Sequence, residues 1–105
     1  MLQIIKNLLG LGPQIDFKEL MKNGAIIVDV RTKGEFKNGH LNNAINIPLD
    51  SISKEISKYE KDKIIITCCA SGMRSASAKS LLKSKGYSNV HNGGSWLSLK
   101  NKLGN

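Results

Sequence analysis

Short apolar runs alternate along the chain with segments whose apolar residues recur at helical spacing. Residues 25–30 and 64–69 are almost continuously apolar and rich in β-branched side chains, which predicts strands buried on both faces. Residues 44–47 predict a further strand. Residues 88–91 predict a last short strand, which a turn at 92–94 would end.

Helix start signals separate these strands. Asp16 and Thr32 are each followed three residues later by glutamate, the pattern of a capping box, and they predict helices that end near Lys22 and Asn38. Apolar residues at helical spacing predict further helices over 52–59, from Ser75 to Gly86, and from Ser95 to about 103. Strands that alternate with helices imply right-handed crossovers, and hence an α/β domain whose mostly parallel sheet carries helices on both faces.

The first thirteen residues stand apart from this alternation. Residues 2–11 carry apolar side chains at helical spacing, so 1–13 are expected to form an amphipathic helical extension of a domain spanning 14–105. We expect no membrane span, because such a span needs about 20 apolar residues. The basic start and small-residue cleavage site of a signal peptide are also missing.

The segment from Ile64 to Ser75 carries the candidate chemistry. Its strand ends at Cys68 and Cys69, passes through a turn of small residues around Gly72, and continues into a helix. The unpaired N–H groups and the dipole of a helix N-terminus favour an anion at this position. A thiol placed there should ionise more readily than a free thiol, and the thiolate is the nucleophilic form.

Composition narrows the choice of compartment and partner. Neighbouring cysteines cannot join distant segments, so both thiols are expected to be free, as in the reducing cytoplasm. The net charge of +8 makes polyanions candidate partners. However, the fourteen lysines are scattered and only 5% of the residues are aromatic, which favours a solvated basic surface over a nucleic-acid site. The two histidines have no companion ligands in the sequence, so no metal site is predicted.

Three motifs occur in order along the chain. The first is Asp29-Val30-Arg31 with Glu35-Phe36 and segment 39–48, the second is Cys69-x-x-Gly72-x-Arg74-Ser75, and the third is Asn92-Gly93-Gly94-x-Trp96. They cover residues 15 to about 103, and together they resemble the rhodanese-like (sulfurtransferase) domain family. This resemblance implies a three-layer α/β fold with a central, mostly parallel five-stranded sheet flanked by helices.

The resemblance also implies a reaction. In this family the cysteine matching Cys69 takes a sulfane sulfur from thiosulfate or a persulfide, forms a persulfide itself, and passes the sulfur to a thiol or to cyanide. The donor would be a small molecule or a protein persulfide, and no cofactor is implied. The residues of the substrate-binding loop would be Ala70, Ser71, Gly72, Met73, Arg74 and Ser75. Thiosulfate-using members often carry basic side chains just after the cysteine, where this chain has none, so the donor stays open.

Cys68 offers a competing interpretation. Cys68-x5-Arg74 has the spacing of cysteine-dependent phosphatases and arsenate reductases. The glycine of that loop usually stands three positions after the cysteine, which is Ser71 counted from Cys68 but Gly72 counted from Cys69. We therefore assign Cys69 as the nucleophile, and expect Cys68 to be a buried last strand residue or a resolving thiol. A non-catalytic binding module is a third alternative, against which a reactive cysteine argues.

Other residues are expected to support the loop. Arg74 either holds the anionic donor or forms an ion pair with Asp29 or Glu35. Arg31 is expected to brace the site and Asp29 to accept hydrogen bonds from nearby loops. Gly94 is expected to permit a close approach to the loop.

Overall fold

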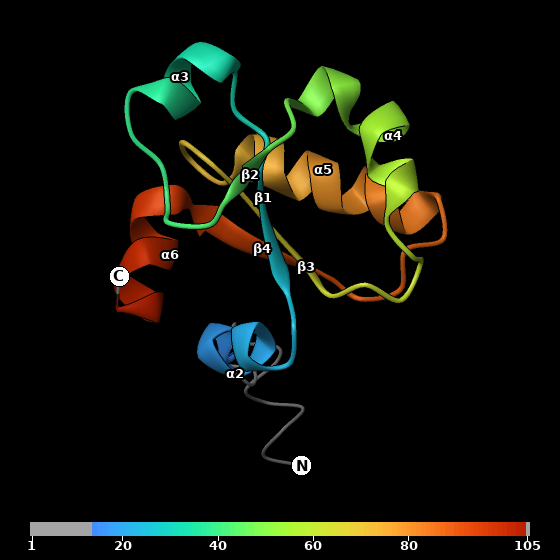
Figure 1. Cartoon of the computed structure of the whole chain (residues 1–105), viewed down its shortest axis with the longest axis horizontal. Coiled ribbons are helices and arrows are strands. Elements are labelled where there is room, and N and C mark those ends of the chain that lie inside the picture. Colours follow the sequence, from blue (N-terminus) through green and yellow to red (C-terminus); the bar gives the residue numbers. More distant parts are fainter. Residues whose placement is uncertain (1–13, 105) are drawn as a thin grey trace, which may run out of the picture.

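The central element is a parallel sheet of four strands in the order β2-β1-β3-β4 (Figure 1). The computed structural model describes residues 14–104, so the helical extension expected over 1–13 lies outside the described residues. The strands are β1 (Ile26–Asp29), β2 (Ile45–Asn46), β3 (Ile65–Cys69) and β4 (Val90–Ser95). The expectation of five strands is therefore wrong for residues 14–104. Gln14 and Ile15, which precede the cap of the first described helix, are not part of a strand.

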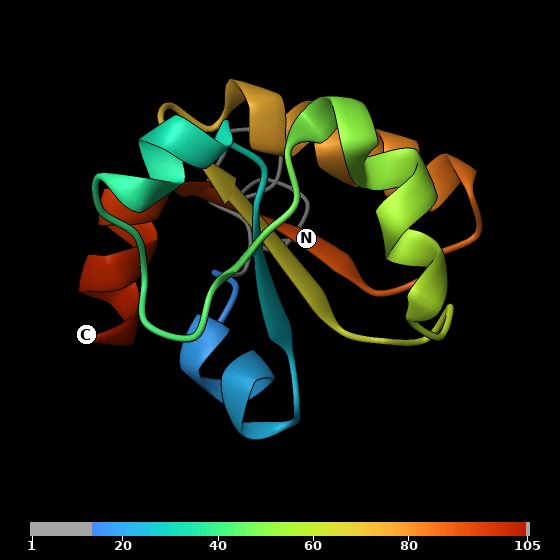
Figure 2. The ribbon, with the colours of Figure 1, turned by 45° about the horizontal axis from the view of Figure 1, so that its top comes forward.

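Helices on both sides of the sheet complete a three-layer α/β domain (Figures 1 and 2). The helices are α2 (Phe17–Lys22), α3 (Lys33–Lys37), α4 (Ile52–Glu55), α5 (Met73–Ser84) and α6 (Trp96–Leu103), with 3₁₀ turns η1 (Leu49–Ser51) and η2 (Ile56–Lys58). Helices α4 and α5 cover one face, and α2 and α6 cover the other. Within residues 14–104, no helix is long and apolar enough to cross a membrane.

The predicted caps begin two of these helices. The Asp16 carboxylate accepts the N–H of Glu19 at 3.1 Å, and Thr32 forms a complete capping box with Glu35. Ser95 caps α6 by accepting the N–H of Ser98 at 3.1 Å. The local polar pattern was therefore sufficient to locate these helix starts.

Two boundaries differ from the prediction, and both lie beside the candidate loop. Helix α5 begins at Met73 instead of Ser75, because Gly72 takes a left-handed φ of +98° and serves as its N-cap. The turn expected at 92–94 is part of β4. Thr67 pairs with Asn92 and the next pairing joins Cys69 to Ser95, so β4 carries one extra residue and forms a bulge there.

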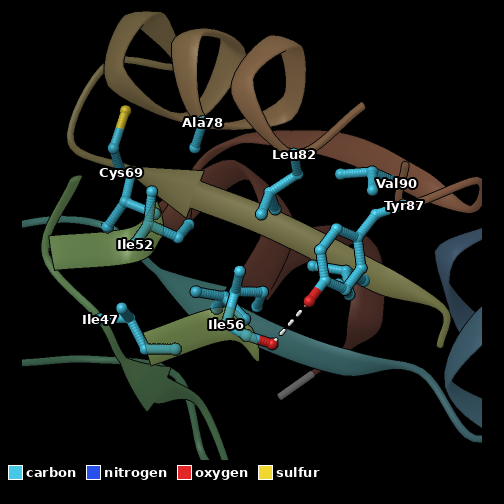
Figure 3. Close-up of a cluster of buried hydrophobic side chains, with 11 residues drawn as sticks. Ile47, Ile52, Ile56, Cys69, Ala78, Leu82, Tyr87 and Val90 are labelled. Carbon is cyan, nitrogen blue, oxygen red and sulfur yellow. Dashed lines mark hydrogen bonds between the residues drawn. The ribbon is translucent and has the colours of Figure 1, made fainter. Parts of the chain in front are cut away.

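Each face of the sheet packs against its own core cluster. Successive strand residues point to opposite faces, so Cys69 belongs to the cluster under α4 and α5, whereas Cys68 belongs to the cluster facing α2 and α6. Figure 3 shows the first cluster, in which the Tyr87 hydroxyl donates to the carbonyl of Ile56 at 2.8 Å. The two adjacent thiols therefore lie in different environments.

Candidate active site

The loop that links β3 to α5 places hydrogen-bond donors around the sulfur of Cys69. Cys69 is the last residue of β3, and its sulfur is directed toward the start of α5 (Figure 3). Its Sγ accepts the backbone N–H of Gly72 at 2.9 Å and that of Ser75 at 3.4 Å. Burial raises the pKa of the Cys69 thiol, but hydrogen bonds from Ser75, Gly72 and Ser71 outweigh this effect and leave that pKa below its usual value. The loop therefore stabilises a thiolate at Cys69.

Cys68 has the opposite character. Its side chain is fully buried in the cluster facing α2 and α6. Burial is the main cause that raises the pKa of the Cys68 thiol to about 12. The loop N–H groups converge on Cys69 and not on Cys68, so the geometry does not support a phosphatase-type loop built on Cys68. The expectation that Cys68 is a buried strand residue is confirmed, although Cys69 and not Cys68 ends the strand.

Glycine keeps the loop close to the bulge of β4. A Cβ at Gly72 would lie 3.4 Å from the Cα of Gly94, so the two backbones are in near contact. Gly94 itself has a φ of +82°, which favours glycine. The predicted close approach of Gly94 to the loop is therefore present.

Asn92 belongs to the third motif, but its role in supporting the loop was not predicted. Its Oδ1 accepts the Ser75 hydroxyl at 2.6 Å and the N–H of Gly94 at 2.9 Å. Its Nδ2 donates to the carbonyl of Gly72 at 3.3 Å. Asn92 thus ties the loop to β4 and also positions Ser75, whose Oγ lies 3.5 Å from the Cys69 sulfur. The sequence held one signal for this role, because Asn92 directly precedes Gly93 and Gly94, the pair expected to lie beside the loop.

Arg31 and Asp29 form a buried brace beside the loop. Asp29 is fully buried, and Arg31 is 4% exposed. The guanidinium donates to both Asp29 carboxylate oxygens, at 2.7–3.0 Å, and its Nη2 also donates to the carbonyl of Gly39 at 2.7 Å. The guanidinium carbon lies 4.9 Å from the ring centroid of Trp96. These contacts join the end of β1 to the segment after α3 and to α6, as a bracing role requires.

Arg74 forms an ion pair with Glu35 and not with Asp29. Its Nη1 and Nη2 donate to the two Glu35 carboxylate oxygens at 2.7 and 2.9 Å. The Arg74 hydrogen bond is the largest cause that lowers the pKa of Glu35 to about 2. Because Glu35 also caps α3, this pair links α3 to the first turn of α5.

A pocket of about 250 Å³ adjoins Arg74. Its lining residues are Val30, Thr32, Pro48, Leu49, Asp50 and Arg74. Because Arg74 belongs to the loop that links β3 to the first turn of α5, this part of the loop forms one side of the pocket. Residues 14–104 contain no group of three or more histidine, cysteine or acidic side chains arranged to hold a metal ion.

The comparison with known proteins agrees with this fold. The sequence model of the Rhodanese-like domain matches residues 14–100, and the chain belongs to that family. Among solved structures, a "rhodanese with anions from E. coli" is 30% identical with a TM-score of 0.69, over 71% of this chain and 91% of that one.

The relatives include two kinds of protein. The chain is 32% identical to the thiosulfate sulfurtransferase GlpE of Pseudomonas savastanoi, over 75% of this chain and 74% of that protein. It is 35% identical to the thiosulfate sulfurtransferase PspE of Escherichia coli, over 64% of this chain and 66% of that protein. It is also 30% identical to the tRNA uridine(34) hydroxylase of Buchnera aphidicola, over 72% of this chain but 27% of that protein. The chain therefore spans about a quarter of the length of that longer relative.

Proposed function

We propose that this chain is a sulfurtransferase that carries a sulfane sulfur on Cys69. The observation that carries the proposal is the convergence of the Gly72 and Ser75 N–H groups on a single buried sulfur whose pKa they lower. A persulfide is an anion, so the donors that stabilise the thiolate would also stabilise the loaded form. The relatives named as thiosulfate sulfurtransferases support the same reaction class.

The reaction consists of two displacements at sulfur. In the first, the Cys69 thiolate attacks the sulfane sulfur of the donor, the bond from that sulfur to the rest of the donor breaks, and its electron pair leaves with the departing group. In the second, a thiolate or cyanide attacks the terminal sulfur and the electron pair returns to Cys69. Both steps conserve charge and need no cofactor, and they constitute nucleophilic covalent catalysis. The free cysteines suit a reducing cytoplasm, where a persulfide on a small molecule or on a partner protein would supply the sulfur.

Mass spectrometry of single-cysteine variants tests the proposal. Purified protein incubated with thiosulfate should gain the mass of one sulfur atom, and cyanide should remove it as thiocyanate. Cys68→Ser should retain this behaviour, whereas Cys69→Ser should lose it. Loading of Cys69→Ser but not of Cys68→Ser would overturn the assignment. Turnover of phosphate esters that Cys68→Ser abolishes would instead support the phosphatase alternative.

The pH dependence of alkylation separates an enzyme from a binding module. Each thiol is measured alone, with Cys69 in the Cys68→Ser variant and Cys68 in the Cys69→Ser variant. Iodoacetamide should modify Cys69 at a pH below the pKa near 8.5 of a free thiol, because the loop lowers the Cys69 pKa. Cys68 should stay unmodified at the same pH, because its pKa is about 12. Equal and slow reaction of both thiols would favour the non-catalytic module.

A further inference from the structure

The one arginine of the loop is already engaged by a carboxylate. Both terminal nitrogens of Arg74 bind Glu35, and the loop positions Ala70, Ser71 and Met73 carry no charge. We infer that Glu35 determines donor specificity by keeping Arg74 away from the substrate, so that the site favours singly charged organic sulfane donors over dianionic thiosulfate. This inference rests on the proposed function, because it concerns the donor in the same reaction.

Glu35 is held in place by Thr32 as well as by Arg74. Glu35 Oε1 accepts the N–H and the hydroxyl of Thr32, each at 3.1 Å, in addition to Arg74. The carboxylate is therefore positioned by the cap of α3 and does not depend on Arg74 for its orientation. Turning Arg74 toward a donor would break two charge-assisted hydrogen bonds. With a pKa of about 2, Glu35 keeps its charge at every pH suitable for an assay.

The pocket beside Arg74 has the character expected for an organic group. Val30, Pro48 and Leu49 supply apolar wall, and of the residues that line the pocket, Asp50 is the one acid and Arg74 the one base. Because Glu35 neutralises Arg74, the exposed carboxylate of Asp50 leaves the pocket with a net negative charge. This arrangement disfavours a second negative charge on the donor.

Thiosulfate and methanethiosulfonate have similar shapes but differ in net charge. Thiosulfate carries two negative charges, and methanethiosulfonate replaces one of its anionic oxygens with a methyl group and carries one. With either donor, the Cys69 thiolate bonds to the outer sulfur and the S–S bond of the donor breaks. The electron pair then leaves on sulfite or on methanesulfinate, respectively, and the charge is conserved in both cases.

The test compares the two donors in the whole chain, with cyanide as the acceptor. The quantity measured is the ratio of kcat/KM for thiosulfate to kcat/KM for methanethiosulfonate. Glu35→Gln should raise this ratio about three- to tenfold, mainly through a lower KM for thiosulfate, because it frees a guanidinium for the second charge. Glutamine can still accept the N–H of Thr32, so the cap of α3 should survive. Glu19→Gln is the matched control, because it removes the same charge at the corresponding position of α2 and should leave the ratio unchanged.

A double variant shows whether Arg74 causes the gain. In Glu35→Gln/Arg74→Gln the ratio should return to about the wild-type value. A gain that persists in the double variant would overturn the inference, as would an unchanged ratio in Glu35→Gln. If circular dichroism shows that Glu35→Gln is unfolded, the double variant decides, because it removes both charges of the ion pair. Its ratio should match that of the wild type, and a clear fall would show that Arg74 already binds thiosulfate.

The outcomes also separate this inference from the proposed function. Wild-type turnover with an unmoved ratio in the variants refutes the specificity role alone and leaves the sulfurtransferase proposal in place. If the wild-type protein takes sulfur from neither donor, both proposals fail.

Discussion

Adding a single methyl group at Gly93 should destabilise the domain by a predictable amount. A Cβ built there lies 2.9 Å from the carbonyl oxygen of Thr67, 2.9 Å from Leu99 Cδ2 and 3.0 Å from Ile66 Cγ2. Distances this short cannot persist, and none of the three neighbours is free to move. The carbonyl belongs to the backbone of the central strand β3, and Ile66 and Leu99 are fully buried. Strand β4 would therefore have to move away from β3.

This crowding sets the expected loss of stability. Overpacking of a well-packed core lowers the free energy of unfolding by about 1–3 kcal/mol, which is the effect expected for Gly93→Ala. In a domain of this size each kcal/mol lowers the melting temperature by about 4–8 °C. Urea and thermal unfolding of Gly93→Ala, followed by circular dichroism, measure the loss directly. Because the movement also displaces Asn92, sulfur loading of Cys69 should slow as well.

A second glycine supplies a control of opposite sign. Gly34 lies in α3 with no neighbour within 4 Å of a built Cβ and with an ordinary φ. Gly34→Ala should therefore stabilise the protein by about 0.5–1 kcal/mol, since alanine restricts the unfolded chain and favours a helix. If Gly93→Ala is as stable as the wild type, or more stable, then β3 and β4 are not packed as tightly as the structure indicates.

Three further changes test the supports of the site. Arg31→Lys should lower the free energy of unfolding, measured in urea, by about 2–4 kcal/mol, because an ammonium group cannot form the paired hydrogen bonds of the guanidinium to the buried Asp29. An unchanged urea midpoint would contradict the bracing role. Asn92→Ala should lower the free energy of unfolding by about 2 kcal/mol and slow cyanide-dependent turnover, because it removes the acceptor of the Gly94 N–H, one acceptor of the Ser75 hydroxyl and the donor to the Gly72 carbonyl. Full activity would show that the loop holds its shape without this side chain. Folding lowers the pKa of Glu35 from its usual 4.5 to about 2. The ion pair of Glu35 with Arg74 should therefore stabilise the protein fully above pH 4.5, and this stabilisation should be lost as the pH falls to about 2. Unfolding curves across this interval should therefore depend less on pH in Glu35→Gln than in Glu19→Gln.

Much of the fold followed from local pattern. The apolar runs placed β1, β2 and β3, and the caps at Asp16, Thr32 and Ser95 are found in the structure. These features depend on neighbours within a few residues, which is why sequence reasoning reached them. The bulge of β4 was missed because Asn92-Gly93-Gly94 has the composition of a turn. Only its pairing with β3 makes it a strand.

The site likewise has one part that the local sequence predicted and another that depends on contacts between distant segments. The sequence by itself determined that a thiol lies at the end of a buried strand, just before a helix, and the glycine spacing selected Cys69 over Cys68. The tertiary structure decided which groups surround that thiol. Asn92 is far from the loop in sequence but holds it through Ser75 and Gly72. The choice of partner for Arg74 depended on the fold, which brings Glu35 of α3 within hydrogen-bond distance of the first turn of α5, whereas Arg31 already occupies both carboxylate oxygens of Asp29. Contacts between distant segments form only when the sheet brings strand ends together, so the local pattern left the partner of Arg74 open and gave Asn92 no role.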